Sequence, residues 1–189
     1  MASLSNNSVQ SAQKSAVNTE TAEFGDVAGT RRAARFVADG LAIATYLDGV
    51  DTIWIDASNP AAVQKVEIIK GEKRSGMPLS TALESADLVP LLDRDRIPEP
   101  LRPIFLDPEE LTARLGALAP LRLPVRRDVV HQLPTVLSTR TADGTYWLQN
   151  WIPNGHEAGT LLVRELKKAA VAFPGGTSMN VSGRPEIAD

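Results

Sequence analysis

Short β-prone runs alternate with helix-like patterns along this chain of 189 residues, and this alternation restricts its fold more than any other feature. The β-prone runs are residues 41–47, 51–56, 121–124 and 170–173. The helical patterns cover residues 29–40, 60–70, 107–119 and 161–170, with further short helical pieces within 81–119. We therefore expect a sheet with helices packed against it, in one α/β domain, because this length leaves little room for a second core.

Three polar residues are placed as N-caps of these helices. Thr30 precedes the first helix, Asn59 stands directly before a proline, and Asp107 does the same in the third helix. Proline suits the first helical position because its missing N–H would have no partner there. The apolar side of the second helix is predicted to consist of Val63, Val66 and Ile69.

The composition is that of a folded protein and excludes several kinds of site. Hydrophobic residues make up 43% of the chain and charged residues 23%, with a mean hydropathy of −0.12. Because there is no cysteine, disulfides, thiolate metal sites and cysteine nucleophiles are impossible. His131 and His156 are too few for a histidine-rich metal site. The formal charge of −3 argues against a uniformly basic nucleic-acid-binding surface, but local basic clusters are compatible with it.

The chain divides into a polar segment and a domain. Residues 1–22 are dominated by Ser, Asn, Gln, Ala and Thr and predict a flexible low-complexity tail, followed by a domain over 23–189. The first residues lack the apolar core of a secretory signal peptide. No apolar run approaches the roughly 20 residues that a membrane span requires. We therefore expect a cytoplasmic protein without a membrane span.

Three polar segments contain residues suited to binding an anion. Residues 70–80 hold three cations and one glutamate, a mixture of mobile lysine charges and bidentate arginine forks. Residues 174–183 combine a Gly-Gly pair, read as the end of a strand, with short polar side chains, so backbone amides could approach an anion closely. Residues 122–127 contain three arginines. Taken singly, each segment is more typical of a solvated loop or strand end.

Residues 138–159 predict a hairpin or an excursion from the domain. Turn signals at residues 143–144 and 154–155 flank an aromatic stretch. Its aromatic residues are Tyr146, Trp147 and Trp151. We interpret the segment as an inserted arm that serves as a lid, as an interaction surface or as a decorated surface loop.

In their order along the chain, these segments resemble the YrdC-like domain of threonylcarbamoyl-AMP synthases. The counterparts are the strand with Asp51 and Thr52, the helix from Asn59 into KGEKRSGMPLS, the strand from Arg122 to Pro124, and the loop TSMNVSG. The resemblance covers residues 30–189, and TSMNVSG is its most specific element. It implies an open, twisted mixed sheet with helices packed around it and a concave, locally basic face. It also implies a C-terminus shorter than is usual in the family.

The resemblance further implies an activity and the residues that carry it. Members make threonylcarbamoyl-AMP from L-threonine, bicarbonate and ATP, releasing pyrophosphate, for the modification of a transfer RNA adenosine. The residues that correspond to the family's catalytic positions are Lys70, Arg74, Ser178 and Asn180. Those expected to bind ATP are Arg122, Lys73, Thr177 and Ser182, and those expected to bind threonine are Asp51 and Thr52. We expect Mg²⁺ to be bound through the nucleotide, with no metal site on the protein.

Some assignments have alternatives. The family's Lys-x-Arg pair corresponds here either to Lys70 with Arg74, which we favour, or to Lys73 with Arg74. The strand around Asp51 lacks the family's proline and Gly-Leu, so a non-catalytic module that binds nucleotide or double-stranded RNA is the alternative function. A third alternative is that the chain acts through its aromatic arm at a protein interface.

Overall fold

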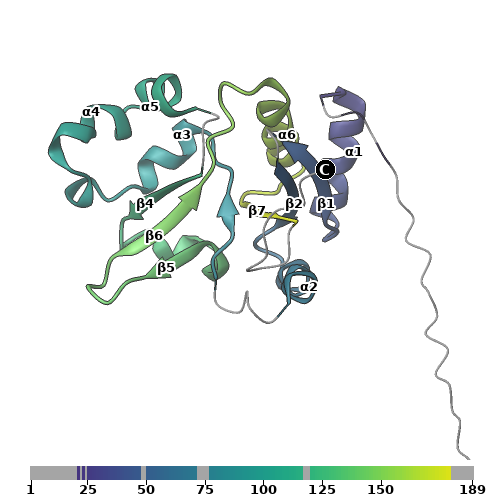
Figure 1. Ribbon diagram of the computed structural model, residues 1–189, viewed down its shortest axis with the longest axis horizontal. Helices are drawn as coiled ribbons and strands as arrows, with labels where there is room; N and C mark the ends of the chain where they lie inside the picture. The colour runs from purple at the N-terminus through teal and green to yellow at the C-terminus, as the bar shows by residue number, and fades with distance from the viewer. Residues whose placement is uncertain are drawn as a thin grey trace, which may run out of the picture.

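The computed structural model describes residues 21, 23, 25–47, 50–71, 77–116 and 120–179. Within these ranges seven strands form one open sheet with helices around it, which confirms the predicted α/β class (Figure 1). The strands are β1 (Ile43–Leu47), β2 (Val50–Asp56), β3 (Ser80–Thr81), β4 (Leu121–Val125), β5 (Ser138–Arg140), β6 (Tyr146–Asn150) and β7 (Pro174–Ser178). The helices are α1 (Val27–Ala38), α2 (Pro60–Lys70), α3 (Ser85–Leu88), α4 (Arg102–Phe105), α5 (Pro108–Leu115) and α6 (Glu157–Lys168). Single 3₁₀ turns lie at η2 (Val89–Leu91), η3 (Arg94–Arg96), η4 (Glu99–Leu101), η5 (Val130–Gln132) and η6 (Thr135–Leu137).

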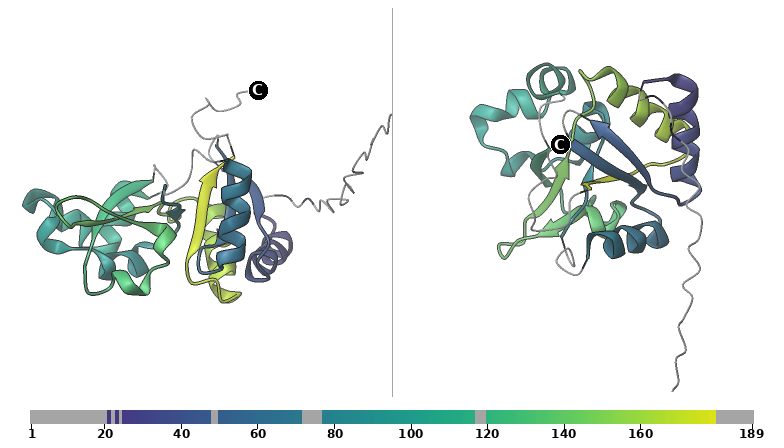
Figure 2. Two further views of the ribbon diagram at one scale, coloured as in Figure 1. Left: turned by 90° about the horizontal axis from the view of Figure 1, so that it is seen from below. Right: turned by 45° about the vertical axis from the view of Figure 1, so that its right-hand side comes forward.

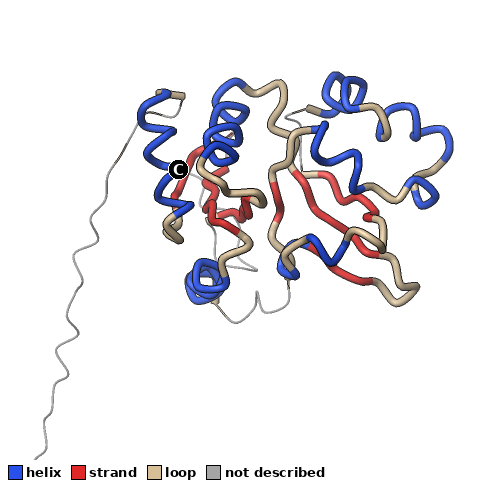
Figure 3. The backbone as a smooth tube through the Cα atoms, turned by 180° about the vertical axis from the view of Figure 1, so that it is seen from behind, coloured by secondary structure: helices blue, strands red, loops and turns tan. Residues whose placement is uncertain are grey.

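The sheet joins segments that are far apart in the sequence. Its strand order is β1-β2-β7-β3-β6-β4, and β5 also pairs with β6. Figure 3 shows the strands in red with the helices in blue around them. The pairs are antiparallel except for β3 with β6, which are parallel. Because β4 pairs along the whole length of β6, strands β5 and β3 lie end to end on the opposite edge of β6. Strand β7, the last of the described strands, lies inside the sheet between β2 and β3.

Helices cover both faces of the sheet at β2 (Figure 2). Trp54 of β2 packs in a buried cluster with side chains of α1 and α6. Ile53 and Ile55 point to the opposite face, because side chains alternate along a strand, and they share a core cluster with Val66 of α2. None of the helices in the described ranges is long and apolar enough to cross a membrane.

Two of the three predicted N-caps are confirmed. The Asn59 side chain accepts hydrogen bonds from the first-turn amides of α2, and Asp107 does so for α5. The prediction for Thr30 is wrong, because α1 begins earlier and Thr30 is buried inside it. Asp26 is the cap instead, and its carboxylate accepts from the Gly29 amide at 2.6 Å. A carboxylate suits this end because it also interacts favourably with the helix dipole.

The last strand lies further along the chain than the sequence predicts. The prediction of a strand at residues 170–173 is wrong: Ala170 has a φ of 67°, and β7 begins at Pro174. Nor does the strand end at the Gly-Gly pair, because Gly175 and Gly176 belong to its interior. A Cβ on Gly176 would lie 3.0 Å from Trp54 Cζ3. Tertiary packing thus favours glycine at a position where intrinsic strand preference disfavours it.

Strands β5 and β6 form the hairpin predicted for the aromatic segment. The turn between them contains Gly144 with a φ of 83°. The Thr141 hydroxyl donates to Asp143, as do the hydroxyl and the amide of Thr145, and these hydrogen bonds hold the pKa of the Asp143 carboxyl far below its usual range. Both strands belong to the sheet, and β6 occupies an interior position in it.

Glu165 connects α6 to α1 and yields a first testable prediction. Its side chain is only 3% exposed and accepts from Lys168 Nζ at 2.6 Å and from Arg31 Nε at 3.0 Å, and these hydrogen bonds lower its pKa. We expect Glu165→Gln to lower the melting temperature at about pH 7. The pKa of Glu165 is lower in the folded chain than in the unfolded chain, so its carboxylate stabilises the fold at pH values above the unfolded-state pKa. This stabilisation is lost as the pH falls through the pKa of Glu165 in the folded chain.

The difference in melting temperature between Glu165→Gln and the unmodified chain should therefore shrink as the pH falls from about 7 to about 3. Thermal unfolding followed by circular dichroism at several pH values measures it. The control is Glu110→Gln, which removes an exposed ion pair with Arg114 and should have little effect at any pH. A difference for Glu165→Gln that is constant with pH would show that the charge of Glu165 is not its source.

Candidate functional site

A cavity of about 620 Å³ lies over strands β2, β7, β3, β6 and β4. The strand register explains which side chains share it. Arg122 lies opposite Gln149, Ser80 lies opposite Gly176, and Gly176 lies opposite Trp54. Residues opposite each other on adjacent strands point to the same face, and all of these residues line the cavity. The cavity is therefore built across the middle of the sheet.

Four of the residues predicted from the sequence line this cavity. They are Thr52, Arg122, Thr177 and Ser178. Thr52 and Ser178 are directly opposite each other on β2 and β7, so their side chains share a face. Thr177 lies opposite Ile53, so its side chain points to the other face, although the residue still borders the cavity. The fold thus brings together the strand with Thr52, the strand with Arg122 and the first two residues of the TSMNVSG segment, Thr177 and Ser178.

Lys70 lies behind β7 rather than in the lining of the cavity. Residues 62, 66 and 70 of α2 are buried at a spacing of one helical turn, whereas Ile69, predicted to be buried, is 55% exposed. Lys70 is 2% exposed, and its Nζ donates to the backbone carbonyl of Ser178 at 2.6 Å. The structure therefore joins two of the predicted catalytic residues, with Lys70 bound to the backbone of the strand that carries Ser178.

The position of Pro78 explains why the Ser178 carbonyl accepts a hydrogen bond from Lys70. Strands β3 and β7 are antiparallel, and Ser80 lies opposite Gly176. If this register is continued by two residues, Pro78 lies opposite Ser178. On its other side, β7 pairs with β2 through the Met179 amide, which donates to the Asp51 carbonyl at 2.7 Å. The Ser178 carbonyl consequently points toward Pro78, which has no N–H to donate. The Lys70 ammonium supplies a donor in place of the missing amide.

One other predicted residue, Asp51, does not line the cavity. Asp51 is exposed and alternates to the face opposite Thr52, so the cavity is bordered by Thr52 and not by Asp51. The remaining predicted site residues, which fall outside the described residues, are Lys73, Arg74, Asn180 and Ser182. Their assignment to nucleotide binding or catalysis stays a prediction.

The three tryptophans of the chain all line the cavity, which the sequence does not predict. The ring centroids of Trp54 and Trp151 are 6.2 Å apart, and both side chains are largely buried. Trp54 Nε1 donates to Thr45 Oγ1 at 2.8 Å, which fixes the ring against β1. Trp147 is only partly buried. The period-2 alternation of β2 places Trp54 on the same face as Thr52, and this was the available signal in the sequence.

The polar groups of the cavity are held by one another. Arg122 Nη2 donates to Thr139 Oγ1 at 3.1 Å, and its guanidinium carbon lies 5.7 Å from the centroid of the Trp147 ring. Gln149 Nε2 donates to Ser80 Oγ at 2.6 Å. Arg122 is the one charged residue among the described residues that line the cavity. The described part of the concave face therefore has a single positive charge in a lining that is otherwise uncharged, with polar, aromatic and aliphatic residues.

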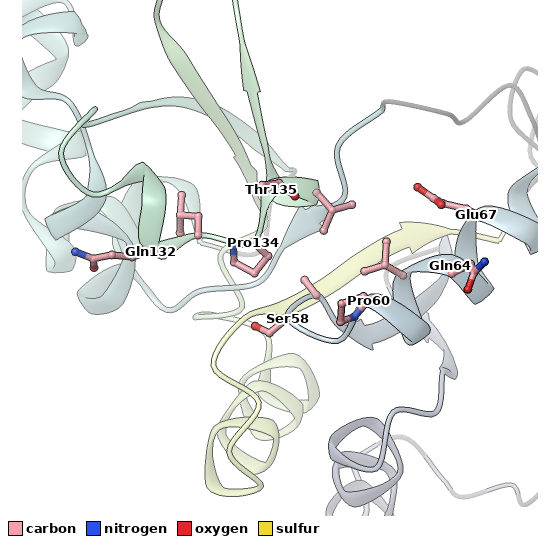
Figure 4. Close-up of a pocket in the computed structure, with 11 residues that line it drawn as sticks. Ser58, Pro60, Gln64, Glu67, Gln132, Pro134 and Thr135 are labelled. Carbon is pink, nitrogen blue, oxygen red and sulfur yellow. The ribbon is translucent and has the colours of Figure 1, made fainter.

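No group of three acidic or histidine side chains in the described ranges could hold a metal ion. A second cavity, of about 440 Å³, lies between α2 and the segment from η5 to η6 (Figure 4). It is lined by side chains such as Gln64, Glu67 and Gln132, and by none of the site residues predicted from the sequence. The cavity with Arg122 and Ser178 is therefore the candidate functional site.

Comparisons with known proteins bear on the fold. No protein-family model and no curated protein matches the chain. Two solved structures of Sua5 from P. abyssi are similar to it. A variant with two alanine substitutions has 22% sequence identity and a TM-score of 0.55, covering 85% of this chain and 43% of that one. A complex with L-threonine has 23% identity and a TM-score of 0.54, covering 88% of this chain and 42% of that one. The chain spans less than half the length of these neighbours, and its fold is that of a YrdC/Sua5-like domain.

Proposed function

We propose that this chain catalyses the ATP-dependent synthesis of threonylcarbamoyl-AMP from L-threonine and bicarbonate, in the cavity that contains Arg122. The observation that carries the proposal is the meeting of Thr52, Arg122 and Ser178 in one cavity, from three segments that resemble the synthase family. A fold neighbour that binds L-threonine supports it. The product would be used in the modification of a transfer RNA adenosine.

The chemistry suits a site with few ionisable groups among its described residues. The threonine amine and bicarbonate form a carbamate with loss of water, and a carbamate oxygen then attacks the α-phosphorus of ATP. The bond from that phosphorus to the bridging oxygen breaks, and pyrophosphate leaves. No nucleophile from the protein takes part, so positioning and electrostatic stabilisation are the main requirements. Arg122 would stabilise an oxyanion, Thr52 and Ser178 would donate hydrogen bonds, and Mg²⁺ would arrive with ATP.

The proposal is tested by measuring pyrophosphate release from ATP with and without threonine and bicarbonate, followed by mass analysis of the adenylate. We expect pyrophosphate release to require both threonine and bicarbonate. In Arg122→Ala we expect release to fall by about tenfold, because one charge-assisted contact is lost. The matched control is Arg127→Ala, because Arg127 is an exposed arginine of the same segment that does not line the cavity. Release that needs neither substrate, or that is unchanged in Arg122→Ala, would contradict the proposal.

A second candidate function is a non-catalytic module that binds nucleotide or double-stranded RNA. It is favoured by the position of Lys70, whose ammonium is bound to the backbone of β7 instead of lining the cavity. In that case the folded protein would bind ATP but release no pyrophosphate. RNA bound through its phosphates would dissociate steeply as salt is raised, and a titration at several salt concentrations would identify it.

A further inference from the structure

We propose that strand β1 is the contact surface of a homodimer, in which two copies of this chain join their sheets by antiparallel pairing of β1 with β1 about a two-fold axis at Ala44. The surface consists of the outer edge of β1 and of the side chains beside it on β2 and α2. Its residues are Ala42, Ala44, Tyr46, Asp51, Lys65 and Ile69, and none of them lines the cavity. The inference therefore stands independently of the proposed function.

The first observation is that β1 is the end strand of the sheet (Figure 1). It pairs with β2 on one side, and no strand of the described ranges pairs with its other side. Such an edge presents a row of N–H and C=O groups that a further strand can bind. Edge strands of monomeric proteins are commonly protected by proline or by charged residues, but β1 has the sequence IATYL and contains neither.

The backbone groups at this edge are those of Ala44 and Tyr46. The Asp51 carbonyl accepts from the Met179 amide next to β7, so the backbone groups of Asp51 point away from β1. Tyr46 lies opposite Asp51 in the antiparallel pair of β1 and β2, and the two therefore form a pair without mutual hydrogen bonds. The N–H and C=O of Tyr46 consequently point outward, as do those of Ala44 two residues earlier.

The side chains of the same two residues are exposed. Ala44 lies opposite Ile53, which packs in the core cluster with α2, so Ala44 and Tyr46 project to the face of the sheet that α2 covers. Tyr46 is 67% exposed, the value of a side chain with little covering it. The edge thus combines unpaired backbone groups with an exposed aromatic ring.

Helix α2 adds an apolar side chain beside this edge. Lys65 Nζ donates to the Gly40 carbonyl, just before β1, so this side of α2 faces the edge of the sheet. Ile69 lies one turn further along the same side of the helix and is 55% exposed. An isoleucine here is unexplained by the core of a single chain, but it suits a contact with a second copy.

A two-fold axis at Ala44 makes the surface complementary to itself. It places Ala44 opposite the same residue of the second copy, and Tyr46 opposite Ala42 of the partner subunit. A large side chain then meets a small one at both ends of the paired strands. The Tyr46 and Ile69 side chains of both copies fill the space between the two α2 helices, on one face of a continuous sheet.

The charges at the two ends of the surface also match. Lys65 lies beside the start of β1, whereas the exposed Asp51 lies opposite Tyr46, near the end of the strand. Antiparallel pairing brings the Lys65 end of each copy next to the Asp51 end of the other. The two ends therefore attract each other twice in the dimer, which favours a second copy as the occupant of this edge.

The test combines sedimentation equilibrium with cysteine cross-linking of the full chain. The unmodified protein should have twice the mass of one chain, which is 20.3 kDa. The sequence contains no cysteine, so Ala44→Cys introduces the only thiol. Hydrogen-bonded residues of an antiparallel pair have Cα atoms about 5.5 Å apart, which is within disulfide range. We expect Ala44→Cys to form a disulfide-linked dimer when it is treated with oxidised glutathione.

The register supplies matched controls for the cross-link. In the proposed pairing the two copies of Tyr46 lie roughly 13 Å apart along the strands, so Tyr46→Cys should not cross-link with itself. An equal mixture of Tyr46→Cys and Ala42→Cys should cross-link, because these positions lie opposite each other. Ala113→Cys, at an exposed alanine of α5, controls for random collision and should not cross-link.

Substitutions on the surface test the energetics. Tyr46→Lys should convert the dimer to a monomer, because it adds charge at the apolar contact. Leu101→Lys is the control, since Leu101 is an exposed leucine in η4, outside the surface. Asp51→Lys and Lys65→Glu should each weaken association by about fivefold, and the two substitutions together should restore it.

Melting temperatures show whether each variant is folded, and pyrophosphate release tests the proposed function separately. A mass of one chain for the unmodified protein, with no cross-link in Ala44→Cys, would overturn the proposal. So would a dimer that Ala44→Cys fails to cross-link and that folded Tyr46→Lys leaves intact, because its contact would lie elsewhere. A cross-link in Tyr46→Cys alone would overturn the axis at Ala44.

Discussion

Asn150→Leu is expected to lower the free energy of unfolding by about 4 kcal/mol, because it leaves several buried backbone groups without partners. Asn150 is fully buried, and its Oδ1 accepts from the Leu83 amide at 2.8 Å. Its Nδ2 donates to the carbonyls of Leu83 and Trp151, both at 3.1 Å. Leucine has a similar volume but can make none of these bonds, and each unpaired buried group costs about 1–3 kcal/mol.

The position of Asn150 explains why this effect is large. Thr81 lies opposite Asn150 in the parallel pair of β3 and β6, and this pair is a single step of the ladder. The Asn150 side chain continues the connection by binding the backbone of Leu83, just after β3 ends. The Asn150 side chain therefore takes the place of further strand pairing between β3 and β6.

Urea unfolding of Asn150→Leu, with the slope m compared with that of the unmodified chain, measures the effect. Gln64→Leu is the control, because Gln64 is an exposed amide on α2 and its replacement should change stability by less than about 0.5 kcal/mol. If Asn150→Leu fails to fold, Asn150→Ser provides a smaller change at the same position. A loss below about 1 kcal/mol in Asn150→Leu would contradict the role assigned to the amide.

The parts of the fold that depend on neighbouring residues could be predicted from the sequence. The pairing of β1 with β2, the start of α2 at Asn59 and that of α5 at Asp107 each follow from residues a few positions apart. The position of β7 could not be predicted in this way. It involves contacts with Trp54, more than a hundred residues earlier, whose ring would lie within 3.0 Å of a Cβ at Gly176.

The candidate site, too, could be predicted from the sequence only in part. The order of motifs predicted that Thr52, Arg122 and Ser178 serve one site, and the structure places all three around one cavity. The motifs did not predict the contact of Arg122 with Trp147, because it depends on the register between β4 and β6. The placement of Asp51 away from the cavity follows from strand alternation alone, which assigns neighbouring residues to opposite faces.

Lys70→Met is expected to reduce pyrophosphate release by about 30-fold, because one buried hydrogen bond from a charged donor is lost. Methionine fits the buried volume of the lysine but cannot donate to the Ser178 carbonyl, which lies opposite a proline in the extended register. We expect the end of β7 to shift, and with it the Ser178 side chain in the cavity. Lys65→Met is the matched control, since Lys65 of the same helix also donates to a backbone carbonyl, that of Gly40, but outside the cavity.

Ligand affinities distinguish this positioning role from the direct role that the family resemblance implies for Lys70. If Lys70 holds the backbone of β7, Lys70→Met should weaken adenosine, AMP and ATP by similar factors, because all three would meet the same displaced strand. If the ammonium instead contacts the phosphates, the loss should increase with the number of phosphates, since each adds charge near the lysine. Equal affinities in Lys70→Met and the unmodified chain would exclude both roles. The bond to the Ser178 carbonyl, at 2.6 Å from a side chain that is 2% exposed, favours the first result.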